Sequence, residues 1–149
     1  MATLVGNEER SITMLEHLIA LDYDAVEAYD AAIARLDSEE FRQQLAEFKA
    51  DHERHIRELR PIVKELGGDP PTTADFKGML AKGRVVLADL IGDAAILRAM
   101  KANEDGTNAA YERARSRTDV SDGIHALLAR NQADEHRHRA WIEATLRTL

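Results

Sequence analysis

The sequence predicts an all-α protein, a bundle of four long helices in which one long crossover connection joins the second helix to the third. Apolar residues recur at alternating spacings of three and four along most of the chain, as in helices that bury one stripe in a shared core. Glycine and proline concentrate in GGDPPTT at residues 67–73, which divides the chain into two halves. Each half contains one short turn signal, so each is expected to form a pair of helices.

The first half is expected to form a helix pair within residues 8–66. Its turn is LDSEEF at residues 36–41, where Ser38 is the expected N-cap of the second helix. Gly67 and Gly68 are expected to end that helix, and Pro61 is expected to kink it or remove a backbone hydrogen bond. The buried stripes of the two helices are predicted to be Ile12, Leu15, Ile19, Asp22, Val26, Tyr29, Ile33 and Leu36, and Phe41, Leu45, Phe48, His52, His55, Leu59, Ile62 and Leu66.

The second half is expected to form the other helix pair, within residues 85–149, after a crossover at residues 67–84. TADFKGMLAKG at residues 73–83 predicts a short helix inside the crossover. The third long helix is expected from about Arg84 to about Arg117, and Ser121 is the expected cap of the last one. Their stripes are predicted to be Leu90, Ala94, Leu97, Lys101, Glu104, Asn108 and Tyr111, and Ile124, Leu128, Asn131, Glu135, His138, Ile142 and Leu149. Residues 1–149 are therefore expected to form a single domain.

The composition argues against several classes of function. A formal net charge of −7, with lysine and arginine interspersed among acids, argues against a nucleic-acid partner, which needs a clustered basic face. The chain has no cysteine, so a metal would have to be held by histidine, carboxylate or water. The start of the sequence lacks the pattern of a signal peptide, and no run approaches the ~18 apolar residues of a membrane helix. We therefore expect a cytoplasmic protein without a membrane partner, a monomer or a small homo-oligomer.

One charged phrase occurs twice in the chain. ADHERHI at residues 50–56 returns as ADEHRHR at residues 133–139, and at nearly the same offset DYDAVEAYD at 22–30 falls on EDGTNAAYE at 104–112. The repeat places six polar residues on the predicted apolar stripes: Asp22, His52, His55, Glu104, Glu135 and His138. Unpaired charges in a core are costly, whereas side chains three residues apart on a helix can reach one metal ion. A metal site at mid-bundle would compensate these residues; a polar network satisfied without metal is the alternative.

These residues carry a resemblance to a known superfamily. Glu135-x-x-His138 resembles the Glu-x-x-His motif of the ferritin-like di-iron carboxylate proteins, Asp22 with Tyr29 looks like the ligand position of their first helix, and Glu104 with Tyr111 looks like that of their third. Together with LGGDP, FKGMLAKG and NEDGTNAAYERA, they make nearly the whole chain similar to the bacterial DUF2383 family. The resemblance implies a ferritin-like four-helix bundle with a di-metal site. The family itself has no established activity.

The second helix departs from the superfamily pattern, because it offers His52-x-x-His55 where Glu-x-x-His is expected. A neutral imidazole has one free lone pair, so the bridging of two metals would fall to Glu135 alone. We therefore expect an asymmetric site for two divalent ions, or a site for a single ion. Iron is the expected metal, with manganese or zinc as alternatives.

Asp51 and Asp134 precede the motif histidines, one step off the predicted stripes. One hypothesis is that each accepts a hydrogen bond from an imidazole across the bundle and so fixes its tautomer. The alternative is an exposed acid that contacts His55 or His138 on its own helix.

Other polar or aromatic residues near the site are assigned simpler roles. Tyr29 and Tyr111 are interpreted as core aromatics, with hydrogen bonding to ligands or redox activity as the alternative. Residues beside the stripes are expected to face solvent: His17, Glu27, His125 and His136.

Three classes of function fit the sequence. The first is a di-iron or iron–manganese enzyme, an oxidase, peroxidase or ferroxidase that reacts with oxygen or peroxide. The second is a non-catalytic protein that binds iron or zinc. The third is a structural bundle in which the polar layer only fixes helix register.

Overall fold

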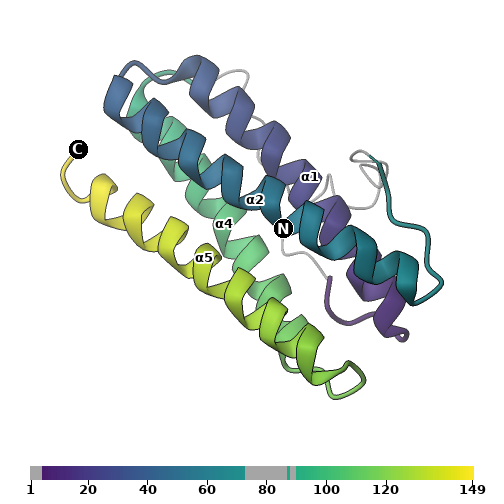
Figure 1. Cartoon of the computed structure of the whole chain (residues 1–149). Coiled ribbons are helices and arrows are strands. Elements are labelled where there is room, and N and C mark those ends of the chain that lie inside the picture. Colours follow the sequence, from purple (N-terminus) through teal and green to yellow (C-terminus); the bar gives the residue numbers. More distant parts are fainter. Residues whose placement is uncertain (1–4, 73–86, 88–89) are drawn as a thin grey trace.

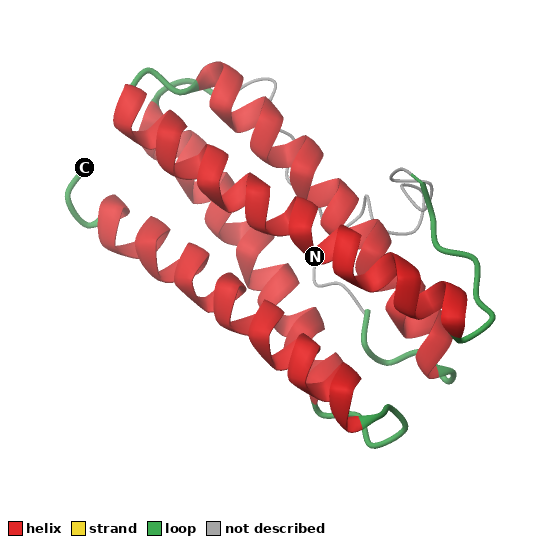
Figure 2. Ribbon diagram, in the orientation of Figure 1, coloured by secondary structure: helices red, strands yellow, loops and turns green. Residues whose placement is uncertain are grey.

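The computed structural model describes residues 5–72, 87 and 90–149, and these residues form four long α-helices and no strand (Figures 1 and 2). The helices are α1 (Ser11–Arg35), α2 (Glu39–Glu65), α4 (Asp93–Arg115) and α5 (Asp122–Leu146). The predicted all-α four-helix bundle is confirmed. The short helix predicted at 73–83 lies outside the described residues. No described helix combines the length and the apolar character needed to span a membrane.

The local signals at three helix ends act as predicted. The hydroxyls of Ser38 and Ser121 accept hydrogen bonds from the backbone N–H groups of the third residue of α2 and of α5. At the end of α2, Gly67 takes a left-handed φ of +83°, its N–H donates to the carbonyl of Lys64 and that of Gly68 donates to Val63. These two backbone hydrogen bonds form a Schellman motif, which ends the helix. Helix α2 continues through Pro61.

The third long helix begins later than predicted. The periodicity suggested a start near Arg84, yet residues 90–92 are not helical and α4 begins at Asp93. The reason is Gly92, whose φ of +91° and ψ of 148° are incompatible with a helix interior. The predicted stripes also reached too far at two ends, since Leu66 and Leu149 lie beyond their helices and are exposed.

Two helix pairs make up the bundle, α1 with α2 and α4 with α5, and α1 also packs on α4. The Asp93 carboxylate accepts hydrogen bonds from the backbone N–H groups of Asp37 (2.7 Å) and Ser38 (3.1 Å), so α4 starts beside the turn between α1 and α2. Helix α2 ends at the opposite end of the bundle (Figure 1). The end of α2 and the start of α4 therefore lie at opposite ends of the bundle, as a long crossover between them predicts.

Two apolar clusters fill the interior, one toward each end of the bundle. One cluster joins the start of α1, the end of α2, the end of α4 and the start of α5, with Leu15, Leu59, Tyr111 and Leu128 among its members. The other joins the opposite ends of the same helices, with Leu36, Leu45, Leu97 and Ile142 among its members. Between them all four helices contribute polar side chains, and this polar layer is the candidate functional site.

Candidate metal centre

The six predicted site residues lie together in the polar layer, and all are removed from solvent. Each of the three histidines and Glu135 is 0% exposed, Asp22 is 1% exposed and Glu104 is 2% exposed. One carboxylate comes from α1, one from α4, and an i, i+3 pair comes from each of α2 and α5. The helical period turns both members of each pair toward the axis, which is why two nearly identical phrases far apart in sequence meet in space.

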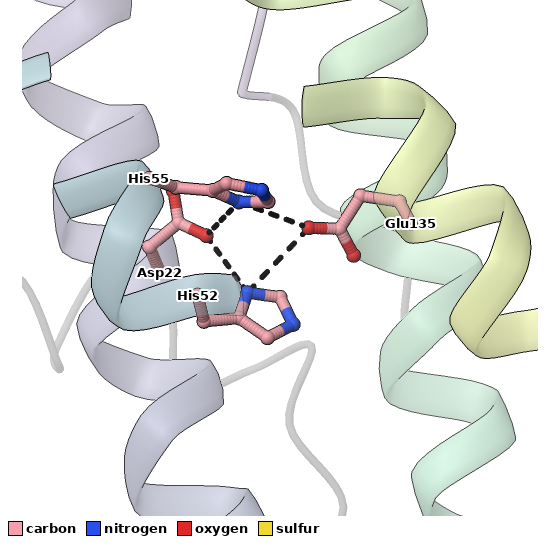
Figure 3. Close-up of side chains that lie close together, drawn as sticks. All are labelled: Asp22, His52, His55 and Glu135. Carbon is pink, nitrogen blue, oxygen red and sulfur yellow. Dashed lines mark hydrogen bonds and ion pairs between the residues drawn. The ribbon is translucent and has the colours of Figure 1, made fainter. Parts of the chain in front are cut away.

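The first cluster consists of Asp22, His52, His55 and Glu135 (Figure 3). Asp22 Oδ1 lies 2.8 Å from His52 Nδ1 and 3.3 Å from His55 Nδ1. Glu135 Oε1 faces the same two nitrogens from across the bundle, at 3.5 Å from each. Two carboxylate oxygens and two imidazole nitrogens thus surround one point, a donor set that could hold a divalent metal ion.

The second cluster shares two residues with the first and consists of His52, Glu104, Glu135 and His138. Glu104 Oε1 lies 3.4 Å from His52 Nε2 and 3.6 Å from His138 Nδ1. Glu135 Oε2 lies 3.9 Å from His138 Nδ1. The structure therefore brings all six predicted residues into two adjoining groups, each of which could hold a metal ion.

Two buried atoms of these clusters have no hydrogen-bond partner among the described residues, Glu135 Oε1 and His138 Nδ1. A buried acceptor or imidazole nitrogen without a partner is costly, so the metal-free arrangement is incompletely satisfied. Glu135 Oε1 lies 3.5 Å from the Nδ1 atoms of His52 and His55, and His138 Nδ1 lies 3.9 Å from Glu135 Oε2. The donor set and the two unsatisfied atoms together fit a metal ion.

Burial and mutual interaction displace the pKa values of the clustered groups. Burial, reinforced by the charges of Glu104 and Asp22 and opposed by His52, raises the pKa of Glu135 well above its usual range. Burial would also raise the pKa of Glu104, but the imidazoles of His138 and His52 hold it well below its usual range. Burial lowers the pKa of His52, but the carboxylates of Glu135, Asp22 and Glu104 outweigh it and raise that pKa well above its usual range. In metal-free protein the protons held within this interacting group therefore offset part of its buried charge.

Asp51 and Asp134 accept hydrogen bonds across the bundle. Asp134 Oδ2 lies 2.9 Å from His55 Nε2, and Asp51 Oδ2 lies 2.8 Å from His138 Nε2. The hypothesis of a cross-bundle contact thus holds, and the alternative of an exposed acid on its own helix is wrong. Each contact favours the proton on Nε2 and leaves Nδ1 directed at the clusters.

Two arginines, Arg54 and Arg137, each form ion pairs with both of these acids. Arg54 contacts Asp51 at 2.9 Å and also pairs with Asp134 across the bundle, whereas Arg137 contacts Asp134 at 3.0 Å and pairs with Asp51. Burial would raise the pKa of Asp134, but its bond to His55 and the charge of Arg54 lower it to about 2. This charged quartet links α2 to α5 beside the clusters and keeps Asp134 ionised.

The two tyrosines do more than fill the core. The Tyr29 hydroxyl on α1 donates to Glu104 Oε1 on α4 at 2.5 Å, and the Tyr111 hydroxyl on α4 donates to Asp22 Oδ2 on α1 at 2.6 Å. The interpretation as simple core aromatics is therefore incomplete, although both are buried. Burial first, and then the adjacent carboxylate, raises the pKa of each phenol well above its usual value, so both remain protonated donors.

The sequence reasoning missed Thr107, whose buried hydroxyl lies 2.9 Å from Glu135 Oε2 and 3.3 Å from Glu104 Oε2. Asn108, which was placed on the stripe but given no role, donates to the backbone carbonyls of Glu104 at 2.7 Å and Glu135 at 3.1 Å. These two residues connect α4 to α5 at the level of the site. The spacing of three and four residues from Glu104 was the available signal.

The remaining histidines lie outside the two clusters. His136 is exposed, as expected, whereas His17 and His125 are partly buried. His17 Nδ1 lies 2.6 Å from Glu8, and His125 bonds the backbone carbonyl of Arg117. Their expected solvent-facing role was therefore wrong for these two. Glu27 is exposed, as expected.

The comparison with known families confirms the resemblance to DUF2383. A family model described as "Domain of unknown function (DUF2383)" matches residues 10–117. The match spans α1, α2 and α4 and ends before α5, so Glu135 and His138 lie beyond it. No curated protein is similar enough to count as a match.

Proposed function

Because the chain belongs to the DUF2383 family, which is defined without a function, we propose its function from the site: it is a ferritin-like protein that binds two divalent metal ions and reacts with oxygen or peroxide. The observation that carries the proposal is the pair of adjoining clusters, each with four buried donor residues and two of them shared. A layer of this kind without metal leaves buried polar atoms unsatisfied, whereas two ions would give them partners.

The ligands in this proposal are the six predicted residues. Asp22 and His55 would hold the first ion, Glu104 and His138 would hold the second, and the two residues that both clusters share, His52 and Glu135, would serve both. The hydrogen bonds that Asp134 and Asp51 accept would hold the imidazoles of His55 and His138 with Nδ1 toward the ions. Iron is the first candidate and manganese or zinc are alternatives, because imidazole and carboxylate donors suit these metals more than magnesium or calcium.

Bound iron or manganese would supply the electrons for reduction of oxygen or peroxide. The chain's own residues would exclude water, orient the donors and hold protons. Tyr29 and Tyr111 keep their hydroxyl protons and donate hydrogen bonds to Glu104 and Asp22, and the apolar clusters above and below the layer shield it from bulk water.

A non-catalytic metal-binding role is the second candidate, favoured by the three imidazoles in the donor set. Such a set suits zinc, which has no redox chemistry. A structural bundle without metal, in which the polar layer only fixes register, is the third.

Anaerobic loading with ferrous iron, followed by rapid mixing with oxygen or with peroxide, separates these functions. The redox proposal predicts a change in absorbance that requires both iron and the oxidant and that is absent from Glu135→Ala. Iron binding without an oxidant-dependent change would support the non-catalytic role. A thermal unfolding midpoint indifferent to iron, zinc and chelator would support the structural one. His136→Gln, a change at an exposed histidine of the same helix, is the matched control.

A further inference from the structure

His52 is placed differently from the other two histidines of the site. Its Nδ1 lies 2.8 Å from Asp22 and 3.5 Å from Glu135 in the first cluster, whereas its Nε2 lies 3.4 Å from Glu104 in the second. His55 and His138 each use Nε2 to bond an aspartate outside the clusters. Only His52, among the three, directs both ring nitrogens at carboxylates of the two clusters.

The ring of His52 is held in this orientation by its neighbours. Its centroid lies 5.4 Å from that of Tyr29, 5.2 Å from that of His138 and 5.5 Å from that of His55, and the residue is fully buried. A ring packed on several sides keeps one orientation. The two nitrogens are therefore fixed toward different clusters.

In the internal repeat, His52 occupies the position equivalent to Glu135. Glu135 is the carboxylate that the two clusters share. Glu135 faces the first cluster with Oε1 and the second with Oε2. At the equivalent position of the other half, His52 faces the first with Nδ1 and the second with Nε2. Both shared residues thus offer one donor atom to each cluster.

We propose that His52 bridges two divalent metal ions, with Nδ1 bound to the ion of the first cluster and Nε2 to the ion of the second. The inference rests on the proposed di-metal function and specifies how the two ions are joined. Each ring nitrogen that carries a proton loses it as an ion binds: the N–H bond breaks, the electron pair stays on that nitrogen to bind the ion, and the proton passes to solvent.

The charge of the site supports this bridge. Two divalent ions bring four positive charges, and the carboxylates of Asp22, Glu104 and Glu135 bring three negative ones. A neutral His52 would leave one positive charge buried, which is costly in a water-excluded site. The deprotonated ring adds the fourth negative charge and makes the two ions and their ligands together electrically neutral.

The test is a zinc titration of the full chain labelled with ¹⁵N histidine, followed by long-range ¹H–¹⁵N correlation spectra and by elemental analysis of the same samples. Zinc is diamagnetic and redox-inert, so the readout is independent of activity. The signals of His52 are assigned by their loss in His52→Gln. His136→Gln serves as the control for a histidine outside the clusters.

With two zinc ions bound, we expect both ring nitrogens of His52 to lack an attached proton, whereas His55 and His138 each keep one N–H. His52→Gln is expected to bind zinc at least about tenfold more weakly at both positions, and His136→Gln as wild type does. A ring N–H that persists on His52 in the two-zinc protein, or saturation at one zinc ion, would overturn the bridge but leave metal binding intact. Folded protein that binds no zinc would overturn the bridge and the metal-binding proposal together.

Discussion

Asp134 offers a direct test of the cross-bundle contacts, because Asp134→Asn keeps the shape of the side chain and removes its charge. The carboxylate bonds His55 at 2.9 Å and pairs with Arg54 and Arg137, and its pKa is lowered to about 2. Against an ordinary pKa of 3.8, this shift corresponds to an upper limit of about 2 kcal/mol of stability. Both arginines retain Asp51 as a partner, so no guanidinium is left unpaired.

We therefore expect metal-free Asp134→Asn to lose up to about 2 kcal/mol in urea unfolding at neutral pH. Because the pKa is lowered in the folded state, this stabilisation is present above pH 3.8 and is lost as the pH falls toward about 2. The difference between variant and wild type should shrink over that range. A difference that stays constant with pH would refute the assignment of the shift to Asp134.

The same variant tests the role of Asp134 toward a metal. Loss of the acceptor that orients a metal-binding imidazole typically weakens metal binding about 10 to 100-fold. We expect a loss of this size in zinc affinity, measured by competition with a chromophoric chelator. Asp30→Asn is the control, because Asp30 pairs with Lys49 on the surface and lies outside both clusters. Unchanged zinc affinity in Asp134→Asn would refute an orienting role.

Three further substitutions test separate parts of the account. Glu135→Gln mimics the protonated acid that burial favours, so the metal-free variant should unfold at the same or a higher urea concentration than wild type at pH 7. The variant should nevertheless lose zinc binding. A clear loss of metal-free stability would contradict the raised pKa of Glu135. Tyr111→Phe removes a hydrogen bond to the buried Asp22 carboxylate and should cost about 2 kcal/mol in the same unfolding assay, whereas an unchanged midpoint would show that the bond contributes nothing. Gly67→Ala places a side chain at a φ of +83° with open space around it, so backbone strain alone should cost about 1 kcal/mol, and wild-type stability would argue against the Schellman closure.

The helices were predictable wherever a local signal marks their ends. Ser38, Ser121 and the pair Gly67 and Gly68 act through bonds to residues within five positions, so the sequence contains both partners. The start of α4 was not predictable in this way. Apolar residues continue with helical spacing before Asp93, and the positive φ of Gly92 that stops the helix depends on the path of the chain rather than on periodicity.

For the site, the repeat was enough to identify the six clustered residues. It did not show which ring nitrogen each histidine turns toward its neighbours, because that depends on contacts between α2 and α5. The tyrosines were undervalued for a similar reason. Their acceptors lie 75 and 89 positions away in sequence, on the other helix pair. Long-range hydrogen bonds of this kind depend on how the helices pack. Periodicity predicts which face of each helix is buried, but not which residues of different helices come into contact.

Elemental analysis would decide whether the polar layer binds metal. The protein is purified without a metal-affinity tag from cells supplied with iron, manganese and zinc, and its metal content is compared with that of the double variant Glu135→Ala/His138→Ala. We expect close to two ions per chain in the wild type, with iron foremost, and loss of bound metal in a double variant that remains helical by circular dichroism. Wild-type protein that is folded and free of metal, or a double variant that retains both ions, would contradict this expectation.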